Sequence, residues 1–466
     1  MEANGNGELN GNQAGDGGRA VLTILCVITV VSVLLFGAVD SGTLIILALL
    51  FSIALSIWFW KAIGRGSFEI SFDVLQLPLI ALFVWGLIQL LPFGSVNAPA
   101  GLISTSVASS ISLDPYATRF FLARLLLFII FFAAFLTFFK GSTRQKTVVI
   151  ALIGFGGLLA FYSILQRVED PSSVYGVRQP GQASPFGTYI NRHHFAALME
   201  MTLALSAGLI FAGGLKRNRL PFMIAAAVVM AISIVLTGSR GALLGVISSF
   251  AVIAGSSLYR RKNDKRSSLS PILIIASCAL FLIVTAGLVV FLDGSDPLLR
   301  STGMSVATSD FSTGRKEFWR VAIKIFLDHP IMGVGFDSFG VAFSKYDPSS
   351  GLFRVEQAHN DYLQMLADGG IVAFACVVGF LYLLVGKSLA AVSETSEGFP
   401  RGASIGAFAG CVAMMVHSFV DFPLRTPANV TMPSATACTA VPNGVAMSMP
   451  VCRAERPSNG SARTPK

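Results

Sequence analysis

Apolar runs recur along the whole chain, and their length decides the class of protein. A run of about 18 or more apolar residues can cross about 30 Å of hydrocarbon as a helix. Backbone groups in lipid must be satisfied within their own segment, which favours helices over barrel strands for runs of this length. The pattern predicts an all-α fold, a polytopic membrane helix bundle with about eleven transmembrane helices. The runs lie near residues 20–38, 43–60, 74–92, 120–139, 147–165, 194–214, 220–237, 241–259, 271–292, 369–386 and 403–420.

The polar segments between the runs divide the chain into five parts. Residues 1–19 are rich in Gly and Asn and are expected to be disordered. Nine spans are expected within 20–292, followed by a large loop over 293–368. Two further spans fall within 369–421, and residues 422–466 form an atypical tail that is expected to be disordered.

The large loop is too long for a simple connection and is expected to contain short helices. Its segment 312–330 has Phe318, Val321, Ala322 and Phe326 at helical spacing, so they share one face. An amphipathic helix of this kind lies on a membrane surface or covers a cavity.

Charge is sparse, and its distribution gives the orientation of the chain. Only 13% of residues are charged, against roughly 25% in soluble domains. Every second loop is basic, which predicts a cytoplasmic N-terminus by the positive-inside rule. This accounts for the net charge of +9 without a nucleic-acid partner. The basic residues are Lys61, Arg65, Lys140, Arg144, Lys146, Lys216, Arg217, Arg219, Arg260, Arg261, Lys262, Lys265, Arg266, Lys387 and Arg401.

The sequence contains no motif typical of a metal or cofactor site. Four of the six cysteines lie inside apolar runs and never form CxxC, so they are interpreted as small apolar residues. No metal-ligand spacing occurs, and we predict neither a metal nor a cofactor.

The candidate chemistry lies in the loops expected to face outward. Arg192, Arg240 and Arg315 all fall in such loops. A guanidinium group presents donors that fit phosphate in a bidentate manner, so three together favour a lipid-linked pyrophosphate. The alternative for each arginine alone is contact with lipid headgroups.

His359 lies at the end of the large loop, beside Asn360 and Asp361. A neutral imidazole accepts a proton near pH 7, so His359 is a candidate general base. The alternative is a histidine that packs at a helix end. Asp361 would not face His359 in a regular helix, because residues i and i+2 point apart. His417 and Asp421 close the last apolar run on the same predicted side.

Five stretches of the chain resemble one family, the O-antigen ligase/O-antigen polymerase family of bacterial inner-membrane proteins. The resemblance covers residues 187–429. The stretches are "GTYINRHHFAALMEM" (187–201), "LTGSRGALLG" (236–245), "STGRKEFWRVAIKIFLDHPIMGVGFDSFG" (312–340), "AHNDYLQMLADGGIVA" (358–373) and "HSFVDFPLRTPAN" (417–429).

The resemblance implies a metal-independent, GT-C-like membrane glycosyltransferase. Such proteins transfer a glycan from undecaprenyl pyrophosphate to an acceptor hydroxyl on the periplasmic face of the inner membrane. The acceptor is a lipid A–core sugar in ligases, another lipid-linked repeat in polymerases, and a protein hydroxyl in the protein O-oligosaccharyltransferase branch. The motifs leave these branches open.

The resemblance also implies roles for individual residues. The essential ligase histidine, in an H-[NSQ]-x9-G pattern, corresponds to His359, with Asn360 and Gly370 completing the pattern. Ala373 stands where the ligase pattern has Gly, Thr or Tyr, which puts the ligase branch in doubt. The arginines that hold the pyrophosphate correspond to Arg192, Arg240 and Arg315, and His194 is a better match than His193.

These observations favour an inverting transfer in which His359 takes the proton of the acceptor hydroxyl. A transporter or flippase is the alternative from another class. Transporters tend to place ionisable residues near the middle of the membrane, whereas these spans are almost free of them. A structural or lipid-binding membrane protein is a third possibility.

The composition changes abruptly after Asn429. Members of the family continue with a twelfth span, but residues 430–466 are rich in Pro, Ser, Thr and Ala and hold no long apolar run. The change indicates a frameshift, with a natural divergent tail as the alternative. Without that span the tail is expected to lie outside, and Asp421 and Arg425 are expected to lose neighbours.

Overall fold

The structure is a computed structural model of the chain, and it describes most of the expected membrane region. The expected span at 271–292 and the first part of the large loop lie almost entirely outside the described residues. Those described are 5–96, 107–181, 183–212, 214–263, 276, 279, 283, 315–347, 355–395, 398–431 and 445–450.

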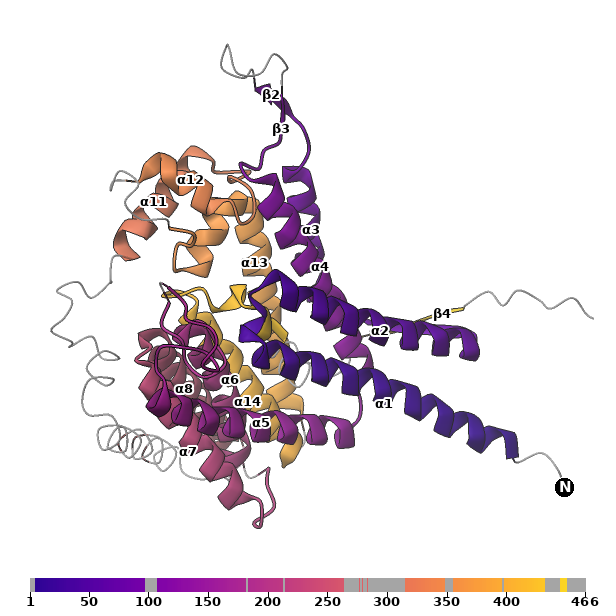
Figure 1. The fold of residues 1–466 in the computed structure, drawn as a ribbon. Coiled ribbons are helices and arrows are strands. Elements are labelled where there is room, and N and C mark those ends of the chain that lie inside the picture. The colour runs from indigo at the N-terminus through magenta and orange to yellow at the C-terminus, as the bar shows by residue number, and fades with distance from the viewer. Residues whose placement is uncertain are drawn as a thin grey trace, which may run out of the picture.

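The described part of the chain is a helical bundle with eight helices long and apolar enough to cross a membrane (Figure 1). Two shorter apolar helices accompany them, Gly18–Leu34 of α1 and the whole of α3. All ten coincide with predicted runs, so the prediction of an all-α polytopic protein is confirmed. The membrane-crossing helices and their two companions are α1 (Gly5–Leu34), α2 (Ser41–Arg65), α3 (Gln76–Gln89), α4 (Pro115–Phe138), α5 (Ser142–Glu169), α6 (Arg192–Phe211), α7 (Leu220–Thr237), α8 (Arg240–Asn263), α13 (Asp361–Glu394) and α14 (Phe399–His417).

Two expected boundaries differ from the helices observed. α1 is already helical at Gly5, inside the Gly- and Asn-rich segment expected to be disordered. α13 begins at Asp361, so the expected boundary between loop and span at 368 falls inside this helix. α13 bends at Gly370, whose φ of 67° is left-handed. A Cβ there would lie 2.1 Å from the Ile331 carbonyl oxygen, so only glycine allows this approach.

Short strands and turns account for further described residues. β1 (Ser67–Phe72) pairs antiparallel with β4 (Val445–Pro450), and β2 (Gly94–Val96) pairs with β3 (Val107–Ser109). β4 lies within the segment that composition predicts to be disordered. The segment from 422 to 431, at the start of the expected tail, packs on the bundle, because Thr426 and Asn429 after the 3-10 turn Pro423–Arg425 are fully buried.

Helices α6 and α14 approach each other closely through glycine. A Cβ on Gly208 of α6 would lie 2.4 Å from the Gly406 Cα of α14. Gly402, Gly406 and Gly410 recur every fourth residue of α14 and face α6, the spacing that brings membrane helices into backbone contact. α8 packs against both α14 and α6. These three helices form the centre of the bundle.

Helices α11 (Arg315–Asp328) and α12 (Phe339–Tyr346) lie over one end of α13 (Figure 1). Val321 and Ala322 of α11 are buried, as the amphipathic pattern predicts, and Ile325 lies at the centre of the buried face. The turn before α12 is tied to α3, because Gln89 donates hydrogen bonds to the carbonyl oxygens of Met332 (2.7 Å) and Asp368 (2.9 Å). These contacts fix the loop helices over the bundle.

The glycine contact between α6 and α14 predicts the effect of Gly406→Val. A Cβ at position 406 would lie 2.7 Å from the Leu205 Cα, so the helices must separate. Overpacking of this kind costs about 1–3 kcal/mol or more. We expect a lower melting temperature and a lower yield of monodisperse protein in detergent. Gly379→Val is the matched control, since open space surrounds Gly379. Equal melting temperatures for the two variants would contradict the role of this contact.

Candidate active site

His359 lies immediately before the residue that caps α13, and several contacts hold its ring. Its φ of 51° is in the left-handed region, which is uncommon for a residue other than glycine. Trp319 of α11 donates a hydrogen bond to the His359 carbonyl oxygen (3.4 Å). The imidazole stacks on Phe318 and meets the edge of Phe422, with ring centroids 5.9 and 4.7 Å away. About 30% of the side chain remains exposed, so a substrate can reach it.

Asp421 is buried among three basic side chains from three different elements. Its Oδ2 lies 3.1 Å from the Arg315 Nη2 of α11 and 3.7 Å from the His193 Nδ1 of α6. Its Oδ1 lies 3.4 Å from the His359 Nδ1. We call His193, Arg315, His359 and Asp421 the His359 cluster. It joins α6, α11 and α13 at the end of α14.

The electrostatics of the cluster favour an ionised Asp421. Burial alone opposes the charge, but His193, His359 and Arg315 outweigh it and hold the pKa of Asp421 well below its usual range. The carboxylate therefore stays negative at neutral pH and can accept a hydrogen bond from the Nδ1–H of His359. This arrangement would leave the Nε2 of His359 as the nitrogen that accepts a proton.

A second set of ionic contacts lies beside the first. Arg425 contacts the carboxylates of Asp337 and Asp368, the latter at 2.9 Å. Arg124 of α4 lies 2.6 Å from Asp337. Burial would raise the pKa of Asp337, but Arg425 and Arg124 lower it below its usual value. We call Arg124, Asp337, Asp368 and Arg425 the Arg425 cluster; it connects α4 and α13 to the turn before α12.

A third polar contact lies inside the bundle. The His417 Nδ1 of α14 is 3.2 Å from both carboxylate oxygens of Glu200 in α6, and both side chains are fully buried. A Cβ on Gly245 of α8 would lie 2.5 Å from Glu200, so this helix packs directly on the pair. The His417 carbonyl oxygen accepts the backbone N–H of Asp421 (3.1 Å). The pair therefore supports the turn that carries Asp421.

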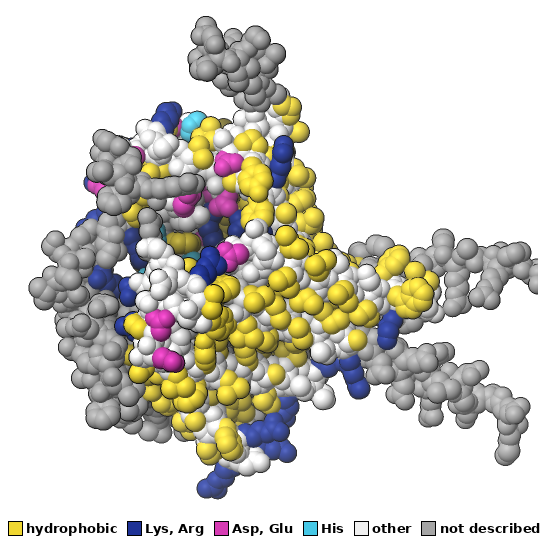
Figure 2. Space-filling view, viewed as in Figure 1, with side chains coloured by type: hydrophobic (Ala, Val, Ile, Leu, Met, Phe, Trp, Pro, Cys, Tyr) yellow, Lys and Arg dark blue, Asp and Glu magenta, His cyan; other side chains and the backbone are white. Residues whose placement is uncertain are grey.

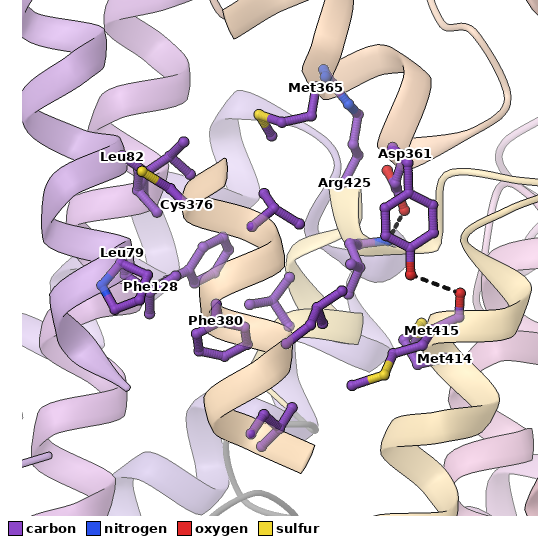
Figure 3. Close-up of a pocket in the computed structure, with 18 of the residues that line it drawn as sticks. Leu79, Leu82, Phe128, Asp361, Met365, Cys376, Phe380, Met414, Met415 and Arg425 are labelled. Atoms are coloured by element: carbon purple, nitrogen blue, oxygen red, sulfur yellow. Dashed lines mark hydrogen bonds between the residues drawn. The ribbon is translucent and has the colours of Figure 1, made fainter. Parts of the chain in front are cut away.

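An apolar cavity of about 290 Å³ opens next to these clusters, between α3, α4, α13 and α14. Asp361 and Arg425 lie at one end of it, and Phe380 lies among the apolar side chains further along (Figure 3). On the outer surface, acidic and basic side chains surround a hollow between the loop helices and the rest of the bundle (Figure 2). A polar site and an apolar cavity thus meet at the same end of the molecule.

The structure brings only some of the sequence candidates to the polar site. Arg315 joins the His359 cluster, where it also donates to the Val420 carbonyl oxygen. Arg240 is the first residue of α8, and the neighbouring Ser239 contacts His193 (3.0 Å). Arg192, the first residue of α6, lines a separate polar cavity.

The other candidates have contacts within the protein. Asn360 caps α13 by accepting the N–H groups of Tyr362 and Leu363, each at 3.0 Å, and donates to the Phe419 carbonyl oxygen. His194 is buried, with its Nδ1 2.6 Å from the Thr426 hydroxyl. Both residues hold the chain that carries Asp421.

Asp361 lines the apolar cavity and does not orient His359. Its Oδ2 accepts the Leu424 N–H at 3.4 Å, as expected if residues i and i+2 point apart. The carboxylate that faces the imidazole is Asp421, which is 62 positions further along the chain.

The local sequence pattern did not predict the contacts of Asp421, Arg425 and Glu200. The signal for Glu200 was present, because an acidic residue inside an apolar run is costly in a membrane and needs a partner. Asp421 and Arg425 lie in a polar stretch directly after an apolar run. Their neighbours come from distant segments, so no local spacing relates them to His359. No group of three or more His, Cys, Asp or Glu side chains that could hold a metal ion occurs among the described residues.

Comparison with known proteins adds a family match. Residues 225–378 match the family model described as O-antigen ligase. No curated protein matches the chain. The matched segment includes Arg240, Arg315 and His359, whereas His193 and Asp421 of the His359 cluster lie outside it.

The burial of Asp421 against Arg315 predicts a pH-dependent loss of stability in Asp421→Asn. At pH 7 the variant leaves Arg315 without its carboxylate partner, and we expect a loss of about 3 kcal/mol. Because the pKa of Asp421 is lower in the folded than in the unfolded protein, its contribution is complete above the unfolded value of about 3.9. This contribution to stability is lost as the pH falls from about 3.9 through the lower pKa that Asp421 has in the folded protein.

Unfolding in detergent over a pH series tests this prediction. The difference between wild type and Asp421→Asn should be constant from pH 7 to pH 5 and shrink below about pH 4. Glu169→Gln, at an exposed acid that ends α5, is the control and should change stability by less than about 0.5 kcal/mol. A difference that stays constant to pH 3 would contradict the ionised, buried carboxylate.

Proposed function

We propose that this chain, which matches the O-antigen ligase family model over residues 225–378, transfers a glycan from undecaprenyl pyrophosphate to an acceptor hydroxyl on the periplasmic side of the bacterial inner membrane. The family supports a glycosyltransferase of the ligase or polymerase type. One observation carries the proposal furthest: the accessible imidazole of His359 faces the buried carboxylate of Asp421 at 3.4 Å.

In the proposed reaction His359 is the general base. Asp421 holds the tautomer with the proton on Nδ1, and the Nε2 takes the proton of the acceptor hydroxyl. The hydroxyl oxygen forms a bond to the anomeric carbon while the bond from that carbon to the phosphate oxygen breaks, with inversion. Undecaprenyl diphosphate leaves with the electron pair. Catalytic hydrogen bonds are often long in the absence of substrate, which agrees with the separation of 3.4 Å.

Positive charge near the leaving group stabilises the developing negative charge on the diphosphate. We assign direct contact with the diphosphate to Arg240, at the start of α8. Arg315 acts through Asp421, because its guanidinium is held by that carboxylate and by the Val420 carbonyl oxygen. Asn360 and His194 support the site, and Asp361 lies where the apolar cavity begins.

The apolar cavity suits the hydrocarbon chain of the donor. In the donor the reacting carbon is joined to the isoprenoid by the diphosphate alone, so the chain must enter the membrane beside the base. Lining residues run along α13 from Asp361 to Leu384, which is roughly 35 Å of helix at 1.5 Å per residue. This length is close to the hydrocarbon thickness of about 30 Å.

The alternatives within the family, a polysaccharide polymerase and a protein O-oligosaccharyltransferase, use the same donor and base. Ala373 bears on packing rather than on the reaction, because it is buried against Phe336 and Leu82. A transporter or flippase is less well supported. The ionisable pair Glu200–His417 within the spans lines neither this cavity nor the separate polar cavity at Arg192.

The general-base role predicts that His359→Ala abolishes transfer. General base catalysis contributes about 10²–10⁴-fold, so the rate should fall by at least about 100-fold. His329→Ala, at an exposed histidine after α11, should keep the wild-type rate.

The measurement is complementation of ligase-null and polymerase-null bacteria, followed by gel analysis of lipopolysaccharide. Restored attachment indicates a ligase, and restored chain length indicates a polymerase. Equal levels of His359→Ala in the membrane are checked by immunoblot. Wild-type transfer by this variant would refute the general-base role.

The cavity predicts that Met415→Trp weakens use of long-chain donors. Met415 lines the cavity (Figure 3), and indole would fill part of its volume. We expect the apparent KM for an undecaprenyl donor to rise about tenfold, because about 1.4 kcal/mol of burial is lost. A ten-carbon donor should be affected less. Leu158→Trp, on the exposed side of α5, is the control. An equal effect on both donors would argue against a chain in this cavity.

A further inference from the structure

Two acid–histidine contacts join α6 to the end of α14, and the acid is on a different element in each. Glu200 of α6 faces His417 of α14, whose Nδ1 lies 3.2 Å from both carboxylate oxygens. Four residues further along, Asp421 faces His193 of α6, with 3.7 Å between its Oδ2 and the Nδ1. The two α6 residues are seven positions apart, so they share one face of that helix. α6 therefore contacts the end of α14 at two points, once with an acid and once with a base.

The Glu200–His417 pair is enclosed by the first two turns of α8. Both side chains are fully buried. A Cβ on Gly241 would lie 2.3 Å from the His417 Cδ2, and a Cβ on Gly245 would lie 2.5 Å from the Glu200 Oε2. The His417 Nε2 has no hydrogen-bond partner among the described residues. The orientation of this ring is therefore fixed by the Glu200 carboxylate and by close packing.

His417 also begins the turn that carries Asp421. Its carbonyl oxygen accepts the backbone N–H groups of Val420 (3.0 Å) and Asp421 (3.1 Å). The Asp421 Oδ1 in turn lies 3.4 Å from the Nδ1 of His359. One turn of backbone thus connects the buried pair with the carboxylate that faces the candidate base. A displacement of His417 would move this carboxylate relative to the imidazole.

The same two contacts reach the start of α8, where Arg240 lies. Ser239, directly before Arg240, has its hydroxyl oxygen 3.0 Å from the His193 Nδ1. Gly241, directly after Arg240, lies against the ring of His417. The neighbours of Arg240 on both sides therefore contact the histidines of the two acid–histidine pairs. A displacement of either histidine would shift the first turn of α8.

The geometry points to a positioning role: we propose that Glu200 and His417 hold Asp421 and the first turn of α8 in register, so that Asp421 keeps the proton of His359 on Nδ1. This inference rests on the proposed function, in which the Nε2 of His359 takes the acceptor proton and Arg240 contacts the diphosphate. The pair lines neither the apolar cavity nor the polar cavity at Arg192. Its effect on transfer therefore passes through Asp421 and Arg240.

Replacement of both partners by apolar residues separates positioning from stability. Removing one partner of a buried pair is destabilising, whereas an apolar pair of similar volume is often as stable as the original. We expect Glu200→Met alone to lower the melting temperature, and Glu200→Met combined with His417→Leu to restore it. The kcat of this double variant, per folded protein, should still be at least about tenfold below wild type, because a displacement of about 1 Å can cost this much.

Thr202→Val is the matched control in the same helix. Thr202 is buried, and its hydroxyl donates to the Leu198 carbonyl oxygen of α6 (2.9 Å). This variant removes a buried polar group without changing a contact between α6 and α14, so it should keep the wild-type kcat.

Nitrogen NMR of histidine-labelled full-length protein in lipid nanodiscs reads the His359 tautomer without requiring transfer. The His359 signals are those that disappear in His359→Ala. At about pH 8, above the ordinary imidazole pKa of about 6.5, wild type should show the His359 proton on Nδ1. The double variant should show it on Nε2, which free histidine side chains prefer. Glu200→Asp keeps the charge but shortens the side chain, and it should cause the same change if the double variant does not fold.

Three outcomes would overturn the inference. One is a wild-type kcat in the double variant. Another is a wild-type His359 with its proton on Nε2, and the third is an unchanged tautomer in the double variant or in Glu200→Asp. Absence of glycan transfer by wild type, together with a tautomer that depends on Glu200, would refute the proposed reaction and keep the positioning role.

Discussion

A single buried carboxylate, Asp421, is the interaction on which the candidate site depends. It lies one turn beyond the end of α14 and contacts Arg315 of α11, His193 of α6 and His359 at the start of α13. A buried charge is tolerated only when it is paired, so these elements must meet for the carboxylate to remain ionised. The same contacts place an imidazole where a substrate can reach it. Stability of the fold and geometry of the site are thus linked through one side chain.

The segment from Ser418 to Arg425 brings two ionic clusters together. Asp421 joins the membrane helices to α11, and Arg425 joins Asp368 of α13 to Asp337 in the turn before the loop helix α12. The Glu200–His417 pair supports the start of this segment. Asn360 donates a hydrogen bond to its Phe419 carbonyl oxygen. Its short length leaves little freedom between the clusters. The loop helices are therefore fixed relative to the bundle by charge as well as by packing.

Two cavities of different character lie in the described part of the bundle. One is apolar and runs along membrane-spanning helices, as a hydrocarbon chain requires, and the other is polar and contains two arginines. In the proposed reaction the hydrocarbon chain of the donor would occupy the apolar cavity, which Asp361 and Arg425 line at one end.

The sequence by itself determined the membrane class and ten of the spans, and it named His359 as a candidate base. Apolar runs of sufficient length have one stable solution in lipid, so ten predicted spans correspond to ten described helices. The order of basic loops predicted that the candidate residues face the same side of the membrane, and the short motifs around Arg240, Arg315 and His359 indicated the family. Each of these inferences depends on residues that are near one another in the chain.

Only the tertiary structure decided which ionisable side chains contact one another. Residues 359 and 421, 315 and 421, and 200 and 417 are far apart in the chain, and periodicity carries no information about which end of one helix meets another. Asp361 was the nearest acid to His359 in sequence, yet helix geometry directs it toward Leu424 and the apolar cavity. The segment after residue 421, whose composition indicated disorder further on, is buried at Thr426 and Asn429 because His194 and Tyr189 bind it. Contacts between distant segments are set by packing of the whole bundle, and that is why the identity of the orienting acid could not be read from local pattern.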